Sequence, residues 1–363
     1  MRSEKDAARG AEARAETAGA SVEADERRGE GAKSETVRDD SAKPETVRTG
    51  AAAVPAAMSP VPAAGASGAA AAASPAAVIS VTGELVFPLL PVRAPESHKG
   101  DFGRVLCVCG CAQYRGAAAL CCLGALRAGA GLVTLAAPEV VAQSVAARIL
   151  EAMFLPLESA ADTGPALEAA ARRATVCAAG CGRAPDADTA RQMAFLLRTV
   201  PGTVVLDAGG LVSLAGQPQA LAAAAGRLIV TPHPGEMAAL LGVPLAEVLA
   251  DGAGAARALA QKTGAVTLLK GHRTLIAAPD GRLWRNTTGC AGLARGGSGD
   301  VLTGIIAGLA ACGLSPADAA VCGVWLHGAA ADRCAARLSM QAMLPEDILA
   351  DMGALFLEKE RAL

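Results

Sequence analysis

A glycine-rich turn at residues 296–300, Gly-Gly-Ser-Gly-Asp, runs directly into an apolar segment that ends at Leu309. Glycine has no Cβ, so Gly297 and Gly299 allow backbone N–H groups to face a ligand closely, and Ser298 adds another amide. A helix that begins here places partial positive charge at the same point. The turn therefore predicts an anion site whose natural ligand is a phosphate group.

Asp300 is the residue of this turn that could move a proton. A structural interpretation is that an aspartate in the first turn of a helix caps free N–H groups and favours the helix dipole. A catalytic interpretation is that the carboxylate orients a substrate hydroxyl and accepts its proton while the turn holds an arriving phosphoryl group. Because a helix N-terminus stabilises a carboxylate, we expect a lowered pKa for Asp300 and hence an ionised, weak base.

Apolar runs alternate with helix-like segments from Val78 onward. Strands are expected at 104–109, 132–136, 175–179, 203–206, 228–230 and 266–269, and helices at 116–128, 237–241, 254–262, 317–338 and after Pro345. A Pro-Asp-Gly turn within 273–285 predicts a hairpin. This alternation predicts one α/β domain over residues 78–363, with a mostly parallel sheet covered by helices on both faces.

Chemically distinctive residues follow several of these strands. They are Gly110 with Tyr114 and Gly116, then Asp207, the segment 231–236, and Lys270 with Gly271. Ligands of open α/β sheets bind beyond the carboxyl ends of the strands. We therefore expect these residues to face the glycine-rich turn at one edge of the sheet.

Residues 1–77 have a different composition. Two short repeats, KSETVR at 33–38 and KPETVR at 43–48, are followed by a stretch of Ala, Pro, Gly and Ser. Such a composition buries too little apolar surface to fold, and it predicts a disordered, low-complexity extension. The net charge of −2 and the aromatic content of 2% argue against nucleic-acid partners. No apolar run predicts a membrane span.

Eleven cysteines are present, and Cys107, Cys109 and Cys111 alternate along one predicted strand. A thiolate metal site is conceivable there, but the CxCxC spacing lacks the CxxC knuckle and a nearby histidine. We favour small buried apolar side chains in a reducing cytoplasm, for these and for the pair Cys121-Cys122.

The motifs together resemble those of the ADP-dependent NAD(P)H-hydrate dehydratases, a family of the ribokinase-like superfamily. The resemblance extends from Ser97 to about Gly353 and includes TPHPGE at 231–236, GGSGDVL at 296–302 and GVWLHGAAAD at 323–332. It implies a ribokinase-like fold and a cytoplasmic hydro-lyase. In that reaction ADP phosphorylates the 6-hydroxyl of (6S)-NADHX or (6S)-NADPHX, and loss of phosphate then regenerates NADH or NADPH, with AMP as the other product.

The resemblance also implies ADP or ATP as phosphoryl donor, Mg²⁺, a homotetramer and a separate NAD(P)HX epimerase, with no nucleic-acid or membrane partner. No carboxylate cluster in the sequence identifies the magnesium ligands. Asp300 matches the family's base, and the other hydrate contacts match Ala117, Gly180, Gly182 and His233. The nucleotide contacts match Lys270, Gly271, His272, Arg273, Thr274, Gly297, Ser298 and Gly299.

Two of these positions have ordinary alternatives. Lys270 or Arg273 could be a solvated surface charge, and His233 could be a buried, hydrogen-bonded histidine. The chain also departs from the family's pattern at Cys181, at Gly209, at Cys290-Ala291 and at Arg295, which puts the affinity for ligands in doubt more than the reaction. An ATP-dependent small-molecule kinase of the same superfamily and a nucleotide-binding protein without activity are the competing hypotheses.

Overall fold

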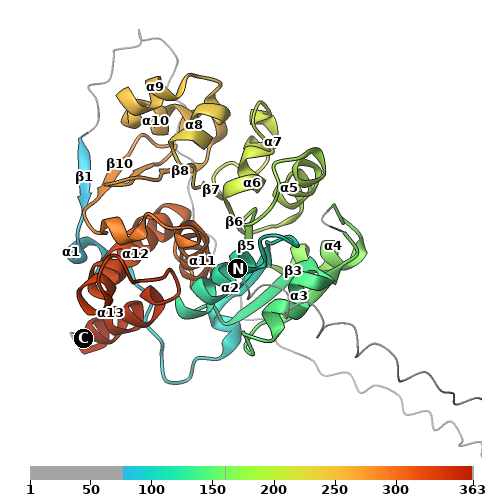
Figure 1. Cartoon of the computed structure of the whole chain (residues 1–363), viewed down its shortest axis with the longest axis horizontal. Coiled ribbons are helices and arrows are strands. Elements are labelled where there is room, and N and C mark those ends of the chain that lie inside the picture. Colours follow the sequence, from blue (N-terminus) through green and yellow to red (C-terminus); the bar gives the residue numbers. More distant parts are fainter. Residues whose placement is uncertain (1–76, 160, 362–363) are drawn as a thin grey trace, which may run out of the picture. The chain divides into compact units, whose positions relative to one another are not determined.

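Ten strands form one central sheet, and helices pack on both of its faces (Figure 1). The computed structural model of the chain describes residues 77–159 and 161–361. The strand order across the sheet is β1-β10-β9-β8-β7-β6-β5-β2-β3-β4. The strands are β1 (Val78–Val81), β2 (Arg104–Val108), β3 (Leu132–Pro138), β4 (Met153–Leu157), β5 (Val176–Ala179), β6 (Thr203–Leu206), β7 (Leu228–Val230), β8 (Val266–Leu269), β9 (Leu275–Ala277) and β10 (Leu283–Asn286).

The sheet is mostly parallel, as the alternation of strands and helices predicts. Strands β2 to β8 pair in parallel with one another, whereas β9 runs antiparallel to β8 and to β10. β9 and β10 are the predicted hairpin. Because the parallel strands share one direction, the segments that follow β2, β5, β6, β7 and β8 meet at the same edge of the sheet.

Helices cover the sheet on two sides, and each side has its own apolar core. They are α1 (Gly83–Val86), α2 (Arg115–Arg127), α3 (Glu139–Ala146), α4 (Pro165–Arg173), α5 (Ala187–Thr199), α6 (Ala208–Val212), α7 (Pro218–Ala222), α8 (Pro234–Leu241), α9 (Leu245–Ala250), α10 (Gly252–Thr263), α11 (Ser298–Ala311), α12 (Pro316–Leu338) and α13 (Ile348–Arg361). Along β2, Val105 and Cys107 face the core with α2, α11 and α12, and Leu106 faces the core with α4, α5 and α10. This alternation is the period-two pattern of a strand buried on both faces.

Helices α2 and α11 lie side by side with almost no space between their backbones (Figure 1). A Cβ on Gly304 would lie 2.1 Å from the backbone oxygen of Cys121, and a Cβ on Gly124 would lie 2.6 Å from that of Val301. Glycine at both positions permits this approach. The contact fixes the first turn of α11 against α2 and against the carboxyl edge of the sheet.

The structure confirms the expected strands and helices, with shifts at their ends. The helix expected at 237–241 begins earlier, at Pro234, because His233 and Glu236 form a capping box. The sequence patterns do not predict the outer strands β1 and β4 or the helices α1, α3, α4, α5, α6, α7 and α9. β4 is a half-exposed edge strand whose apolar run is interrupted by Pro156, a residue that sheets admit mainly at their edges.

Two further expectations concern the N-terminal extension and membrane-spanning helices. The disordered extension predicted for residues 1–77 lies outside the described residues, apart from Ala77. Within the described part of the chain, no helix is both long enough and apolar enough to cross a bilayer.

Candidate active site

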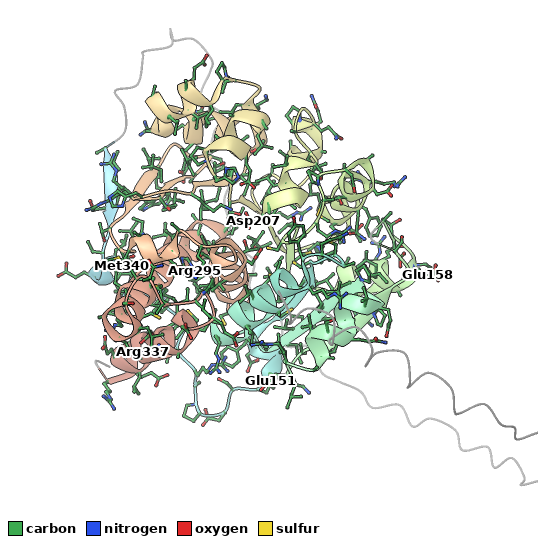
Figure 2. All side chains as sticks on the ribbon, viewed as in Figure 1. Glu151, Glu158, Asp207, Arg295, Arg337 and Met340 are labelled. Atoms are coloured by element: carbon green, nitrogen blue, oxygen red, sulfur yellow. The ribbon has the colours of Figure 1, made fainter. Side chains whose placement is uncertain are left out.

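Two aspartates and one lysine lie close together beyond the carboxyl ends of the inner strands. Asp207 follows β6, Lys270 follows β8, and Asp300 lies in the first turn of α11. Asp207 lies near the centre of the view in Figure 2. The glycine-rich turn lies directly over them, because a Cβ on Gly299 would be 3.4 Å from Lys270 Nζ and 3.6 Å from Asp207 Oδ2.

Asp207 is a buried carboxylate whose oxygens both accept hydrogen bonds. Lys270 Nζ donates to its Oδ1 at 2.6 Å, and the Thr231 hydroxyl donates to the same oxygen at 2.7 Å. The Thr303 hydroxyl donates to Oδ2 at 3.1 Å. Asp207 is 1% exposed, so this bonding compensates a charge that burial would otherwise make very costly.

Lys270 is a charged, largely buried partner of this carboxylate. Its Nζ also lies 3.8 Å from Glu236 Oε2. Burial opposes the ammonium form, but Asp207 and Glu236 outweigh it, so the pKa of Lys270 is raised. The interpretation of Lys270 as a solvated surface charge is therefore wrong. Arg273 is exposed, with a left-handed φ of 63°, and borders the cavity described below.

Asp300 has an environment that differs from the expectation. Burial raises the pKa of its carboxyl to about 6, and the charge of Asp207 adds to this effect, while Cys181 and Lys270 act in the opposite direction. The prediction of a lowered pKa is wrong, because desolvation and a neighbouring carboxylate outweigh the helix N-terminus. A carboxylate with a pKa near neutrality is a better proton acceptor than a fully solvated one.

The residues expected to touch the hydrate lie in two groups. Ala117 and Gly182 are in contact, since a Cβ on Gly182 would be 2.7 Å from the Cβ of Ala117. Gly180 packs on the backbone of Asp207, where a Cβ would lie 2.1 Å from its carbonyl oxygen. Gly180 and Gly182 have left-handed φ angles of 104° and 64°, which glycine adopts without strain. Cys181, between them, brings this loop close to Asp300.

His233 forms the other group, at the start of α8. Its Nδ1 accepts hydrogen bonds from the backbone N–H groups of Gly235 and Glu236, at 3.0 and 3.3 Å. The Glu236 carboxylate in turn accepts from the backbone N–H of His233 at 2.8 Å. The side chain of His233 is 57% exposed, so the alternative of a buried histidine is wrong. The ring is held by its cap and remains open to a ligand.

A cavity of about 480 Å³ lies beside the glycine-rich turn. Its lining includes nearly all the residues expected to contact a nucleotide, which are Lys270, Gly271, His272, Arg273, Thr274, Ser298 and Gly299. Gly297 is not part of the lining. It is the left-handed N-cap of α11, with φ of 99°, and it packs on Leu120. The departures Cys290, Ala291 and Arg295 also line the cavity.

The cavity also contains a residue to which no role was assigned, His327 of α12. It is 7% exposed, and burial lowers its pKa to about 4, so the imidazole is neutral. Its Nε2 has no hydrogen-bond partner among the described residues, nor does the hydroxyl of Ser298. The signal in the sequence that could have identified His327 is its place in the motif GVWLHGAAAD at 323–332. Buried polar atoms are normally paired, so both groups point to a ligand.

Comparison with known proteins identifies the family of the chain. A family model described as NAD(P)H-hydrate dehydratase matches residues 105–352. An ADP-dependent (S)-NAD(P)H-hydrate dehydratase of Neisseria meningitidis is 40% identical over 258 residues, which is 68% of this chain and 83% of that protein. A bifunctional NAD(P)H-hydrate repair enzyme of Moorella thermoacetica is 45% identical over 267 residues, 72% of this chain and 50% of that protein.

The chain thus spans about half the length of the bifunctional relatives it matches. Among solved structures, an ADP/ATP-dependent NAD(P)H-hydrate dehydratase of Bacillus subtilis, co-crystallized with ATP/Mg²⁺, matches with a TM-score of 0.66 and 31% identity. That match covers 78% of this chain and 99% of the other. These matches carry the same description as the family model, and the chain belongs to the NAD(P)H-hydrate dehydratase family.

Proposed function

We propose that this chain catalyses the ADP-dependent dehydration of (6S)-NADHX and (6S)-NADPHX to NADH and NADPH, with release of AMP and phosphate. The observation that carries the proposal is the position of Asp300. Its carboxyl, with a pKa of about 6, directly follows Gly299, which lines the cavity, and lies within 4.8 Å of the sulfur of Cys181, between Gly180 and Gly182. A proton acceptor therefore lies close to the expected places of both substrates.

In the first step, Asp300 accepts the proton of the 6-hydroxyl as its oxygen attacks the β-phosphorus of ADP. One phosphorus–oxygen bond forms to the hydrate, and the bond to the AMP leaving group breaks. In the second step, phosphate leaves C6 and a proton leaves C5, which restores the ring double bond. Hydroxide is a poor leaving group, and its conversion to phosphate makes the elimination possible.

Lys270 and the amides of the glycine-rich turn stabilise the charge that develops on the transferred phosphoryl group. The ammonium stays charged because Asp207 and Glu236 flank it, and it borders the cavity. The N-terminus of α11 faces the same point. Such preorganised charge is the main contribution that a protein makes to phosphoryl transfer.

Mg²⁺ belongs to this proposal as the ion that offsets the charge of the diphosphate. Asp207 already accepts four hydrogen bonds, one of them from a cation, and Asp300 must remain free to accept a proton. Mg²⁺ commonly keeps phosphate oxygens and water as ligands, which fits such a site.

The wider setting is part of the same proposal. The eleven free cysteines support a reducing compartment, the cytoplasm. We expect a separate NAD(P)HX epimerase as the functional partner that supplies the (6S) hydrate, as the family resemblance implies. A homotetramer is expected from the family resemblance, and light scattering on the purified chain tests it.

The near-ultraviolet absorbance of reduced nicotinamide tests the reaction directly. Purified chain is mixed with (6S)-NADHX, Mg²⁺ and either ADP or ATP, and phosphate is measured in parallel. An absorbance rise that needs nucleotide and matches the phosphate released supports the dehydratase, and the faster nucleotide is the donor. Nucleotide binding without any rise in absorbance contradicts the proposal. It would favour the kinase hypothesis instead, which the family match does not favour.

A further inference from the structure

Three buried thiols meet directly behind the active site. Cys109 follows β2, Cys121 lies in α2, and Cys181 lies in the loop after β5. Their sulfur atoms all lie within 4.8 Å of one another, and all three residues are 0% exposed. The CxCxC segment, for which we favoured apolar packing over a metal site, contributes only Cys109 to this group, and Cys111 lies half-buried in the next loop, with its Sγ 3.3 Å from Gln113.

We propose that Cys109, Cys121 and Cys181 form a binding site for one soft, three-coordinate metal ion of the Cu(I) class. Thiolates select soft ions, whereas Mg²⁺ requires oxygen ligands. Metal–sulfur bonds of roughly 2.3 Å in a trigonal site place the sulfurs roughly 4 Å apart. The observed sulfur triangle needs only a small contraction to reach that size. Cys121 lies in α2, and Cys109 and Cys181 follow the buried strands β2 and β5 closely, so the three sulfurs are already close together.

The chemistry of filling the site balances without any redox step. Burial and the neighbouring thiols raise the pKa of all three groups well above its ordinary value, so without an ion they remain protonated. Each S–H that becomes a metal–sulfur bond releases one proton to water, and no electrons move. The ammonium of Lys270 interacts with Cys181 and offsets part of the charge.

The site is linked to the reacting groups through Cys181. The Sγ of Cys181 donates to Asp207 Oδ2 at 3.8 Å, and it lies within 4.8 Å of carboxylate oxygens of Asp207 and Asp300. When the site is filled, Cys181 becomes a metal-bound thiolate, so its hydrogen bond to Asp207 is lost and a negative sulfur lies within 4.8 Å of both carboxylates. We infer that the bound ion slows dehydration, a consequence that rests on the proposed function.

Copper transfer tests the site. The full chain is titrated anaerobically with the Cu(I)–bicinchoninate complex, alongside Cys109→Ala, Cys121→Ala and the control Cys322→Ala. Cys322 is equally buried but lies in α12, outside the cluster. We expect wild type and Cys322→Ala to withdraw a single Cu(I), and the two cluster variants to lose this uptake. Equal uptake by all four proteins overturns the site and leaves the thiols as apolar packing.

X-ray absorption on the copper-loaded wild type gives an answer that does not depend on the folding of any variant. Three sulfurs at roughly 2.3 Å support the site. Nitrogen or oxygen ligands, or only two sulfurs, overturn it. Turnover measured on the same samples tests the inhibition, and Cu(I) should slow wild type but not Cys121→Ala. If no dehydration is found in any sample, the proposed function fails while the copper measurements still decide the metal site.

Discussion

Lys270 Nζ lies 2.6 Å from Asp207 Oδ1, and the pair joins the ends of β6 and β8 beneath the glycine-rich turn. Thr231, Thr303 and Cys181 also donate hydrogen bonds to the carboxylate. In the proposed function the pair serves both the fold and the reaction. It compensates a buried negative charge, and it leaves an ammonium group at the border of the nucleotide cavity.

The first prediction concerns the energy of this pair. Lys270→Met leaves Asp207 buried without its cation, so we expect the free energy of unfolding to fall by about 3 kcal/mol. Adding Asp207→Asn should recover part of the loss, because the uncompensated charge is gone. Urea unfolding of both single variants and the double variant measures the coupling. Lys262→Met, at an exposed position of α10, is the control and should change stability by less than about 0.5 kcal/mol. Additive effects would contradict a coupled pair.

The second prediction concerns pH. Asp300 must be ionised to accept a proton, and its pKa is raised to about 6, mainly by burial and then by Asp207. Activity should therefore be constant above that pH and fall about tenfold per pH unit below it. Asp207→Asn removes one of the raising effects, so the acid limb should move to lower pH. The measurement is kcat/KM for the hydrate against pH, and an acid limb that stays in place would show that Asp207 does not act on the base.

The third prediction is the loss of the base. Asp300→Asn removes the proton acceptor but retains a side chain of the same shape. We expect turnover to fall about a thousandfold, while ADP affinity, measured by calorimetry, stays near wild type. Asp188→Asn, in the exposed part of α5, is the matched control. Near-normal turnover of Asp300→Asn would show that this residue only caps α11.

The sequence patterns predict the inner strands, the glycine-rich turn and the segment 270–274, because each is local and regular in the chain. They do not predict the raised pKa of Asp300, which depends on burial and on Asp207, a residue far away in the sequence. The hydrogen bonds of Thr231 and Thr303 to Asp207 likewise join residues that are distant in the sequence, so local patterns do not predict them. The sulfur cluster also depends on such contacts, since Cys121 and Cys181 become neighbours only when α2 packs on the sheet. Contacts between elements distant in sequence leave no local pattern to read.

The fourth prediction concerns His327 in the nucleotide cavity. Its neutral ring has an Nε2 that finds no partner among the described residues, so we expect the nucleotide to supply one. His327→Phe should weaken ADP binding roughly tenfold and leave the melting temperature almost unchanged. His98→Phe, at a position with a 76% exposed side chain, is the control for any general effect of the substitution. Calorimetry with ADP measures the affinity, and an unchanged Kd would remove His327 from the nucleotide site.

The last prediction concerns the contact that holds α11 against α2. A Cβ on Gly304 would lie 2.1 Å from the Cys121 carbonyl oxygen, so Gly304→Ala must push the helices apart. We expect a loss of about 1–3 kcal/mol in the free energy of unfolding, and a lower kcat/KM because Asp300 and Ala117 move relative to each other. Gly353→Ala is the opposite case. It lies in α13 with no described neighbour within 4 Å of the added carbon, so it should stabilise by about 0.5–1 kcal/mol. Equal melting temperatures for the two variants would mean that the backbone contact between α2 and α11 does not stabilise the fold. An unchanged kcat/KM of Gly304→Ala would mean that this contact does not position the glycine-rich turn.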